Sequence, residues 1–438
     1  MKKQMTARCA ALALAACLLA GCAGGQSGSP APSGGGEPAP GAQSGRPYEG
    51  VELTFLRHSG YDADWMAEKA AEFYEETGIR VTIEQVAYSE VHNKFVVDAS
   101  SGGGVYDLFA TTDYWLPEFY EGGWIADLTP YLSDPALADP EFGLEDISQP
   151  LLDGNSIDGK LLAFPWKFNS QMLAYRSDLM AGAPKDWEEL LAAAKANQGG
   201  GTAGIALALG KASVMDIYLN ALYQNGGSFI AADGKTCGLD SPQAAQALAF
   251  LMELQNYTTD GAINSHWDEA ATLFSQGGAA MATTINTQAG NITDPEKSLV
   301  SGAVEFAELP GPVTACATSS TWGICVTQNC KNPEAAFLYI QYINQAARMR
   351  ELVEGTNGSS VPVRSSLLTD PELMEKYPQF RVMNDIATLP GHTFAYPKST
   401  QSTAIMEVLA GHVQNALLGT ETAEAALAAA KREIEALL

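Results

Sequence analysis

The sequence predicts an α/β fold in which parallel strands are joined by helical crossovers. Residues Val51–Leu56 alternate between apolar and polar side chains, as a strand does. Residues Asp64–Thr77 place apolar side chains at helical spacing, and Ile79–Val86 is again strand-like. A strand, a helix and a strand in this order form a β-α-β unit, and open sheets built from such units bind ligands beyond the carboxyl ends of their strands.

The next elements continue this alternation. Gly78 ends the first helix. A helix is predicted from Ser89 to Ser100, a short apolar strand at Tyr106–Ala110 and a further helix near Trp115–Glu121. We therefore expect binding residues in the loops after the three strands, which combine hydrogen-bonding groups with flat aromatic rings: Arg57–Asp62, Tyr88 and Thr111–Trp115.

The N-terminus has the pattern of a secretion signal. Positive charges at Lys2, Lys3 and Arg8 accompany the apolar run Cys9–Ala20, which is shorter than the about 20 residues that a membrane span needs. The run ends in Leu19-Ala20-Gly21-Cys22, which resembles the bacterial lipobox. That resemblance implies a signal peptide at residues 1–21 and a lipidated Cys22. The alternative is an ordinary signal peptide in which Cys22 has no role.

A tether is predicted at residues 22–47. From Ala23 to Arg46 the chain consists almost entirely of Gly, Ser, Pro, Ala and Gln, without aromatic or β-branched residues. Such a segment cannot bury a core, so we expect it to be disordered and to hold a folded body close to a membrane surface.

Composition limits the classes of partner. The 438 residues are enough for about two to three domains, and no second apolar run is long enough to span a membrane. The formal charge of −26 argues against nucleic-acid binding, which needs clustered Lys and Arg, and favours a soluble extracytoplasmic protein.

Cysteines and histidines show no metal-site spacing. Cys237, Cys316, Cys325 and Cys330 remain after the signal segment, and Cys316 and Cys325 bracket a strand-like stretch, so they either pair or stay buried free thiols. The five histidines are scattered and no Cys-x-x-Cys pair occurs, so we expect no metal and no cofactor. Asp62 and Asp64 lack the further ligand oxygens of a calcium site.

Several passages resemble the extracellular solute-binding proteins of carbohydrate ABC importers, the group to which maltose-binding protein belongs. Each passage is weak alone, and their common order makes the resemblance specific. The passages are Tyr106–Phe109, Glu118–Leu128, Leu162–Pro165, Leu173–Leu179, Asp186–Leu190, Tyr223–Gly227, Phe274–Met281, Asn332–Phe337 and Pro362–Arg364. Asp186 stands where Thr is commoner, and either residue can cap a helix.

The resemblance implies a periplasmic-binding-protein-like α/β fold with two interleaved lobes around a ligand cleft. Lobe 1 would comprise residues 48–165 and 286–345, and lobe 2 residues 166–285 and 346–438, with hinges near Pro165 and Thr284. It also implies capture of a sugar or oligosaccharide by a monomer that is lipid-anchored outside the cell and that delivers the solute to ABC permease subunits.

A sugar site needs hydrogen-bonding side chains in the plane of the ring and aromatic rings on its faces. Carried over position by position, the candidate ligand-binding residues are Tyr61, Asp62, Tyr88, Asp113, Trp115, Trp166, Trp267, Trp322 and Arg364. Core packing is the alternative for the tryptophans, and ion pairing is the alternative for Asp113 and Arg364. His58 and Lys167 are expected to be solvated loop residues.

Two other classes of function remain open. Glu118 and Glu121, or Ser319 and Ser320, suggest a secreted glycoside-processing enzyme, but the sequence has no Gly-x-Ser-x-Gly motif, phosphate loop or His-bearing metal motif, so we expect no enzyme. A binding protein for a polyamine, an iron chelate or a phosphorylated compound is the other alternative, since Asp62 and Asp113 suit a cation and Arg364 suits an anion.

Overall fold

A computed structural model describes residues 46–137, 139–231 and 233–438. The predicted signal peptide, Cys22 and nearly all of the predicted tether lie outside these residues. Among the helices within the described ranges, none is long and apolar enough to cross a membrane.

The predicted strand and helix alternation is present at the start of the folded body. It consists of β1 (Glu52–His58), α1 (Tyr61–Thr77), β2 (Arg80–Val86), α2 (Tyr88–Ser101) and β3 (Leu108–Thr112). Gly78 ends α1 in the left-handed conformation, with φ of 76°. β1 and β3 run two residues beyond their predicted ends, so Arg57, His58, Thr111 and Thr112 belong to strands and not to loops.

The sheet is mixed, so the prediction of parallel pairing is correct only for its first strands. β1 pairs in parallel with β2 and β3, whereas β9 (Ala317–Val326) runs antiparallel to β3 and to β6 (Phe164–Arg176). β7 (Met281–Ile285) and β8 (Val304–Ala307) are also antiparallel to β6. The strand order is β2-β1-β3-β9-β6-β7, with β10 (Thr393–Ala395) beside β9.

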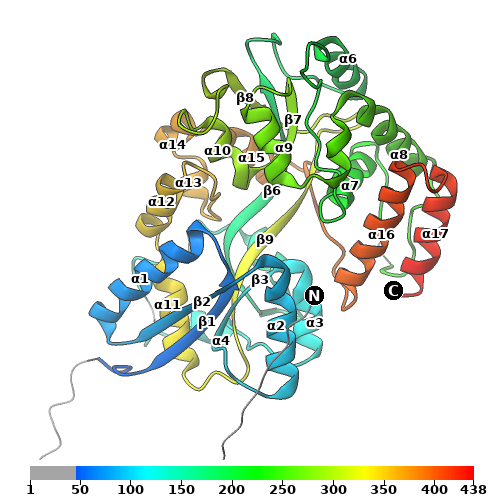
Figure 1. Ribbon diagram of the computed structural model, residues 1–438. Coiled ribbons are helices and arrows are strands. Elements are labelled where there is room, and N and C mark those ends of the chain that lie inside the picture. The colour runs from blue at the N-terminus through cyan, green and yellow to red at the C-terminus, as the bar shows by residue number, and fades with distance from the viewer. Residues whose placement is uncertain (1–45, 138, 232) are drawn as a thin grey trace, which may run out of the picture. The chain divides into compact units, whose positions relative to one another are not determined.

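The long strand β6 connects two groups of elements. Its first part, Phe164–Ser170, pairs with β9, and its last part, Gln171–Arg176, pairs with β7 and β8. Figure 1 shows β1–β3 with α1, α2 and α11 (Pro333–Ile343) on one side of this crossing and β7 and β8 with α9 (Trp267–Ser275) on the other. Pro165 lies at a register shift inside β6, and Thr284 lies inside β7. The predicted lobe boundaries and hinges stay a prediction.

Helix α11, which follows the strands of the second group in sequence, packs against the first group of elements. Tyr339 of α11 donates a hydrogen bond from its hydroxyl to the carbonyl of Met66 in α1, at 2.8 Å, and packs against Phe73. The contact joins residues 273 positions apart. It makes the first group discontinuous in sequence.

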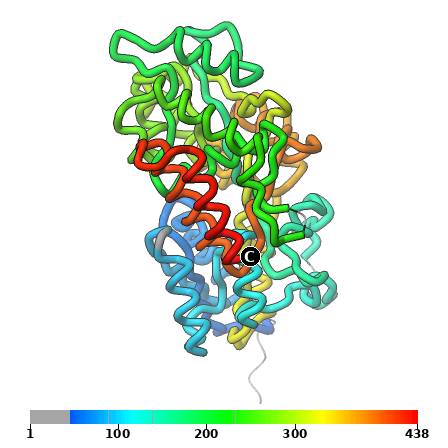
Figure 2. Tube along the Cα trace, turned by 90° about the vertical axis from the view of Figure 1, so that its right-hand side faces the viewer, coloured from blue at the N-terminus to red at the C-terminus, as the bar shows by residue number. Residues whose placement is uncertain are grey.

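Helices surround the second group. They are α6 (Trp187–Asn197), α7 (Val214–Gln224), α8 (Pro242–Leu254), α9 (Trp267–Ser275), α16 (Ser402–Leu417) and α17 (Ala423–Glu435). Figure 2 shows the two C-terminal helices, α16 and α17, lying side by side. Asp186 caps α6, as its sequence context predicts, by accepting a hydrogen bond from the backbone N–H of Glu189 at 2.9 Å.

Short elements complete the fold. The helices are η1 (Asp113–Trp115), α3 (Leu116–Glu121), α4 (Thr129–Leu132), α5 (Gln149–Gly154), α10 (Ala289–Thr293), α12 (Ala346–Gly355), α13 (Ser365–Leu368), α14 (Pro371–Lys376) and α15 (Gln379–Thr388). Two further strands, β4 (Ser156–Ile157) and β5 (Lys160–Leu161), form a separate hairpin.

The four cysteines of the folded body are free thiols. Cys316 precedes β9 and Cys325 lies near its other end. Because a strand rises about 3.3 Å per residue, the two are far beyond the about 4.4–6.8 Å between Cα atoms that a disulfide requires. Of the two alternatives for this pair, the structure has the buried free thiols.

Candidate functional site

A cavity of about 260 Å³ lies where the carboxyl ends of the first strands face the second group of helices. Its lining combines aromatic rings with amide, hydroxyl and carboxylate groups. The lining residues are Tyr88, Thr112, Tyr114, Asn169, Gln171, Ala212, Met215, Asp216, His266, Trp267, Asp268, Ile285, Thr287, Gln288, Ser320, Tyr396 and Met406.

The first group of elements supplies one wall of this cavity. Tyr88 is the first residue of α2, Thr112 is the last residue of β3, and Tyr114 follows in η1. These positions are the strand ends at which the sequence predicted ligand contacts. The hydroxyl oxygens of Tyr88 and Tyr114 lie 3.3 Å apart, within hydrogen-bond distance.

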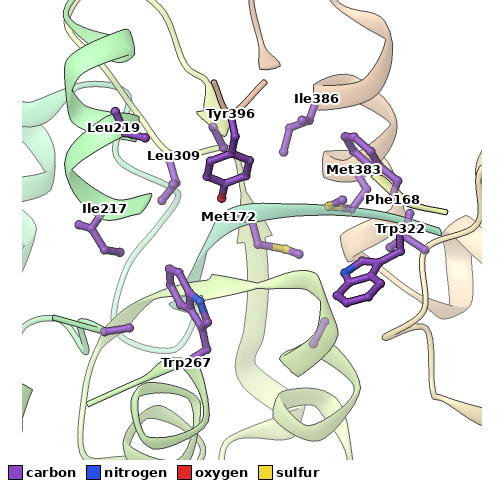
Figure 3. Packing of buried hydrophobic residues seen from close by; sticks show 14 of the residues in the cluster. Phe168, Met172, Ile217, Leu219, Trp267, Leu309, Trp322, Met383, Ile386 and Tyr396 are labelled. Atoms are coloured by element: carbon purple, nitrogen blue, oxygen red, sulfur yellow. The ribbon is translucent and has the colours of Figure 1, made fainter. Parts of the chain in front are cut away.

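The opposite wall comes from two helices and an irregular segment. Asp216 lies in the first turn of α7, Trp267 is the first residue of α9, and Tyr396 directly follows β10. Figure 3 shows Trp267 and the hydroxyl end of Tyr396 in the same region, whereas Trp322, a residue of β9, lies farther away, near Phe168 of β6. Trp267 is 5 % exposed and Tyr396 is 8 % exposed, so both are held firmly by packing.

A buried polar network fixes Tyr396. Its hydroxyl donates to Oδ1 of Asp216 at 2.5 Å. Behind it, Thr318 donates from its hydroxyl to Oε1 of Gln171 at 2.8 Å, and the backbone N–H of Thr318 donates to Oδ1 of Asn220 at 2.6 Å. Burial raises the pKa of Asp216 to about 7, although the hydrogen bond from Tyr396 acts in the opposite direction.

A second cavity of about 440 Å³ adjoins the first and shares Tyr88, Tyr114, Ala212, Met215 and Met406 with it. Its remaining lining residues are His92, Asn93, Trp115, Lys211, Thr403, Glu407 and Ala410. The two cavities are therefore adjacent, with the shared residues as a common wall, and together they make up the cleft.

Trp115 and Trp322 belong to an aromatic cluster beside this cleft. The rings of Tyr88 and Trp115 are stacked at 6.5 Å, and Trp322 meets Trp115 edge-on at 6.2 Å. Trp322 is 5 % exposed and donates from Nε1 to the side-chain oxygen of Asn169 at 3.1 Å in the amide orientation that satisfies both groups. Trp322 thus supports the wall without lining either cavity.

Asp113 is buried next to the cleft. It accepts a hydrogen bond from the backbone N–H of Thr321 at 3.4 Å, and Nζ of Lys398 lies 3.8 Å from its carboxylate. Burial raises the pKa of Asp113 to about 6, and Lys398 opposes that rise. This ion pair is one of the two alternatives that the sequence left open.

Asp62 forms a buried ion-pair cluster instead of lining a cavity. It pairs with Lys167, it accepts a hydrogen bond from the hydroxyl of Ser360 at 2.9 Å, and Arg57 lies 3.8 Å away. Burial alone would raise the pKa of Asp62, but Lys167 and Arg57 outweigh burial and hold it well below its usual range.

The expectation that Lys167 and His58 are solvated loop residues is wrong. Lys167 is 4 % exposed and lies inside β6, where its ammonium pairs with the carboxylate of Asp62. His58 ends β1, and its ring lies 4.6 Å from that of Trp322. Trp166, which is fully buried, packs under the guanidinium of Arg57 and the ammonium of Lys167, so it also lies away from both cavities.

Arg364 and Tyr61 likewise lie away from both cavities. Arg364 is 1 % exposed and donates hydrogen bonds to the carbonyl oxygens of Asn344, Gly143 and Phe142, and to Asp146. Tyr61 begins α1 and is 52 % exposed. Of the nine predicted ligand residues, Tyr88, Trp115 and Trp267 line the cleft, and Asp113 and Trp322 lie beside it.

Asp216, Tyr396, Tyr114 and Gln171 were not predicted. Asp216 lies in an apolar helix and Gln171 within a buried strand, so neither position has a local signal of binding. Tyr114 lies within Thr111–Trp115, one of the segments in which binding residues were expected, but it is not among the nine individual candidates. In the described ranges, no group of three or more His, Cys, Asp or Glu side chains is placed to hold a metal ion.

Comparisons with known proteins agree with this architecture. A probable amino-acid ABC transporter periplasmic-binding protein of Sinorhizobium fredii is 23 % identical over 403 residues, which are 89 % of this chain and 90 % of that protein. An ABC transporter solute-binding protein of Agrobacterium radiobacter, solved with ribitol, is 27 % identical with a TM-score of 0.80, covering 90 % of this chain and all of that one.

A third comparison extends to the maltose-binding proteins. Maltose-bound MalE3 of T. maritima has a TM-score of 0.79 at 23 % identity, over 89 % of this chain and all of that one, and shares the fold. The predicted two-lobed, periplasmic-binding-protein-like α/β fold class is thereby confirmed.

The family match covers most of the chain. Residues 68–382 match the family described as bacterial extracellular solute-binding protein. Its members bind solutes outside the cytoplasm for ABC transporters and are not enzymes, in agreement with the sequence-based expectation. The chain belongs to the family of bacterial extracellular solute-binding proteins.

Proposed function

We propose that the protein captures a small polyhydroxylated solute, a monosaccharide or an alditol, in the cavity between Tyr88 and Trp267. The observation that carries this proposal is the convergence of four aromatic rings with amide and carboxylate side chains around one space. Aromatic rings suit the apolar faces of a sugar, and the polar side chains suit its hydroxyl groups.

The size of the cavity favours a small solute. Its volume of about 260 Å³ is below the roughly 300–1,000 Å³ of pockets for drug-sized ligands. An oligosaccharide would also have to occupy the adjoining 440 Å³ cavity. The Agrobacterium radiobacter protein was solved with ribitol, a small alditol, which supports a small solute over an oligosaccharide.

The proposal also includes anchoring of the protein to the membrane and delivery of the solute to a transporter. The mature chain begins at lipidated Cys22, the segment up to residue 47 tethers the folded monomer to the membrane, and the loaded protein delivers its solute to ABC permease subunits. The order of charge, apolar run and Leu19-Ala20-Gly21-Cys22 supports the anchor. Labelling with a radioactive fatty acid tests it, since Cys22→Ser should abolish incorporation.

Among the alternative solutes, a phosphorylated compound has the least support. The described residues that line the 260 Å³ cavity include two carboxylates, Asp216 and Asp268, and neither Lys nor Arg. A phosphate group would meet negative charge without a compensating cation.

Thermal-shift measurements with monosaccharides and alditols test the proposal. We expect at least one compound to raise the melting temperature of the protein. The substitution Trp267→Ala should lower the affinity for that compound at least tenfold. Trp187→Ala is the control, because Trp187 packs on Phe250 and bonds to Gln224 away from the cleft. The proposal is wrong if only charged solutes without hydroxyl groups stabilise the protein, or if Trp267→Ala leaves binding unchanged.

A further inference from the structure

The cavity holds a carboxylate that has no cationic partner. Asp216 is 6 % exposed, and Tyr396 is the only side chain within the described ranges that donates a hydrogen bond to it. Neither Lys nor Arg in those ranges forms an ion pair with it, although Asp62 and Asp113 each have such a partner. Within this cleft, Asp216 is thus the buried acid whose charge is left uncompensated.

An uncompensated buried carboxylate is costly. Taking an ionised carboxylate out of water is unfavourable unless a partner charge and hydrogen bonds replace the water, so the group tends to become protonated instead. Burial raises the pKa of Asp216 to about 7 for this reason. A solute that brings a positive charge would remove the penalty.

The aromatic rings around Asp216 also suit a cation. Tyr88, Tyr114, Trp267 and Tyr396 line the same cavity, and the rings of Tyr114 and Tyr396 are 5.3 Å apart at 59°. An ammonium group is attracted to the faces of such rings, and the attraction grows as the ammonium is desolvated. Carboxylate and rings together therefore form a better site for an amine than for a neutral hydroxyl group.

The two lysines near the cleft, Lys398 and Lys211, do not pair with Asp216. Lys398 is paired with Asp113, and Lys211 lines the adjoining cavity together with Glu407. Asn169, Gln171 and Gln288 remain in the lining as partners for hydroxyl groups. The site thus combines recognition of hydroxyl groups with one position for a positive charge.

We propose that the solute carries a protonated amine beside its hydroxyl groups, as amino sugars and amino alditols do, and that this ammonium pairs with Asp216. The inference rests on the proposed function, because it adds a charged position to a site for polyhydroxylated solutes. It assigns Asp216 as the residue that distinguishes an amine from a hydroxyl group.

The pairing makes affinity depend on pH. Asp216 must lose its proton before it pairs with an ammonium, so amine affinity should rise from pH 5.5 to pH 8, whereas a neutral solute gains no such rise. The other titratable side chains that line the two cavities are His266 and Asp268 at α9, Tyr88 and His92 on α2, Tyr114 on η1, Tyr396 after β10, Glu407 on α16 and Lys211 before α7.

Calorimetric titration of the purified protein with matched pairs tests the inference. The pairs are 1-amino-1-deoxyribitol with ribitol, and 1-amino-1-deoxysorbitol with sorbitol, at pH 5.5 and pH 8, because the ammonium group of an amino alditol stays protonated at both pH values. We expect the amine of at least one pair to bind tenfold or more tighter than its neutral partner at pH 8, with the preference shrinking at pH 5.5.

Two variants separate the role of Asp216 from a general charge effect. Asp216→Asn should reduce the amine preference, meaning the affinity for the amine relative to that for its neutral partner, to about twofold or less. Glu253→Gln removes the same charge from an exposed position on α8 outside the cavity and should leave the preference intact. Both variants are first checked for an unchanged cooperative melting transition.

Failure of the inference differs from failure of the proposed function. Equal affinity for both members of every pair that binds, or an amine preference that survives in Asp216→Asn, overturns the amine assignment and leaves the polyhydroxylated class standing. If neither these pairs nor any other monosaccharide or alditol binds, both proposals are overturned.

Discussion

Asp216 and Tyr396 are 180 positions apart in the sequence, yet their side chains meet at 2.5 Å in the wall of the cleft. Such a contact leaves no local pattern, because Asp216 lies among apolar helix residues and Tyr396 follows a three-residue strand. Tyr88, Trp115 and Trp267 were predictable, since aromatic residues near strand ends and helix starts are exposed to a cleft in this fold class. The sequence therefore predicted three of the aromatic residues that line the cleft, but neither Tyr396 nor Asp216.

Asp216→Asn should change how stability depends on pH. The folded-state pKa of about 7 lies above the about 3.9 of an unfolded aspartate. Its contribution to stability is therefore fully present below about pH 4 and is lost as the pH rises to 7. Without solute, we expect the variant to be more stable than the native protein at pH 8, by on the order of 4 kcal/mol, and nearly equal at pH 4. Urea unfolding at both pH values measures this, and parallel curves would contradict the assignment.

Arg364→Met should destabilise the fold instead of altering solute preference. The substitution leaves the carbonyls of Phe142, Gly143 and Asn344 without their donor in a buried place. Breaking such an arrangement costs about 3 kcal/mol or more in unfolding free energy. Denaturant unfolding and solute titration are compared in the same preparation. Loss of binding at unchanged stability would mean that Arg364 contacts the solute.

At the scale of elements, periodicity predicted the type of the first five segments but not the direction of the later strands. Residues Phe164–Arg176 and Ala317–Val326 are buried along nearly their whole length, and a strand that is buried on both faces shows no alternation that would indicate its neighbours or its direction. Antiparallel pairing of β9 with β3 and β6 brings Trp322 beside Thr112, behind the cleft. The position of Trp322 follows from this register.

The cap of α6 gives a test at this scale. Asp186→Ala removes the acceptor for the backbone N–H of Glu189 and should lower the unfolding free energy by about 1 kcal/mol. Asp186→Thr is the matched control, because a threonine hydroxyl can accept the same bond, and it should recover most of the loss. Denaturant unfolding of both variants checks this, and an equal loss in both would show that the cap contributes nothing measurable.

At the scale of the whole molecule, the resemblance to carbohydrate-binding relatives predicted a discontinuous arrangement of the chain that local sequence patterns do not indicate. Helix α11 packs on α1 through a contact of Tyr339 with Met66, and the periodicity of the sequence does not predict this long-range contact. The order of many individually weak passages along the chain indicated the solute-binding family, and the family match over residues 68–382 agrees with that assignment. The exact lobe boundaries depend on where the chain crosses in β6 and β9, which side-chain patterns do not mark.

A crystal structure of the protein with the tightest-binding monosaccharide, alditol or amino derivative tests the central claim most directly. We predict that the solute lies in the cavity between Tyr88 and Trp267, with a ring or carbon chain against Trp267 and a polar group on Asp216. Solute bound away from Trp267, Tyr396 and Asp216, with this cavity filled by water alone, would contradict the account.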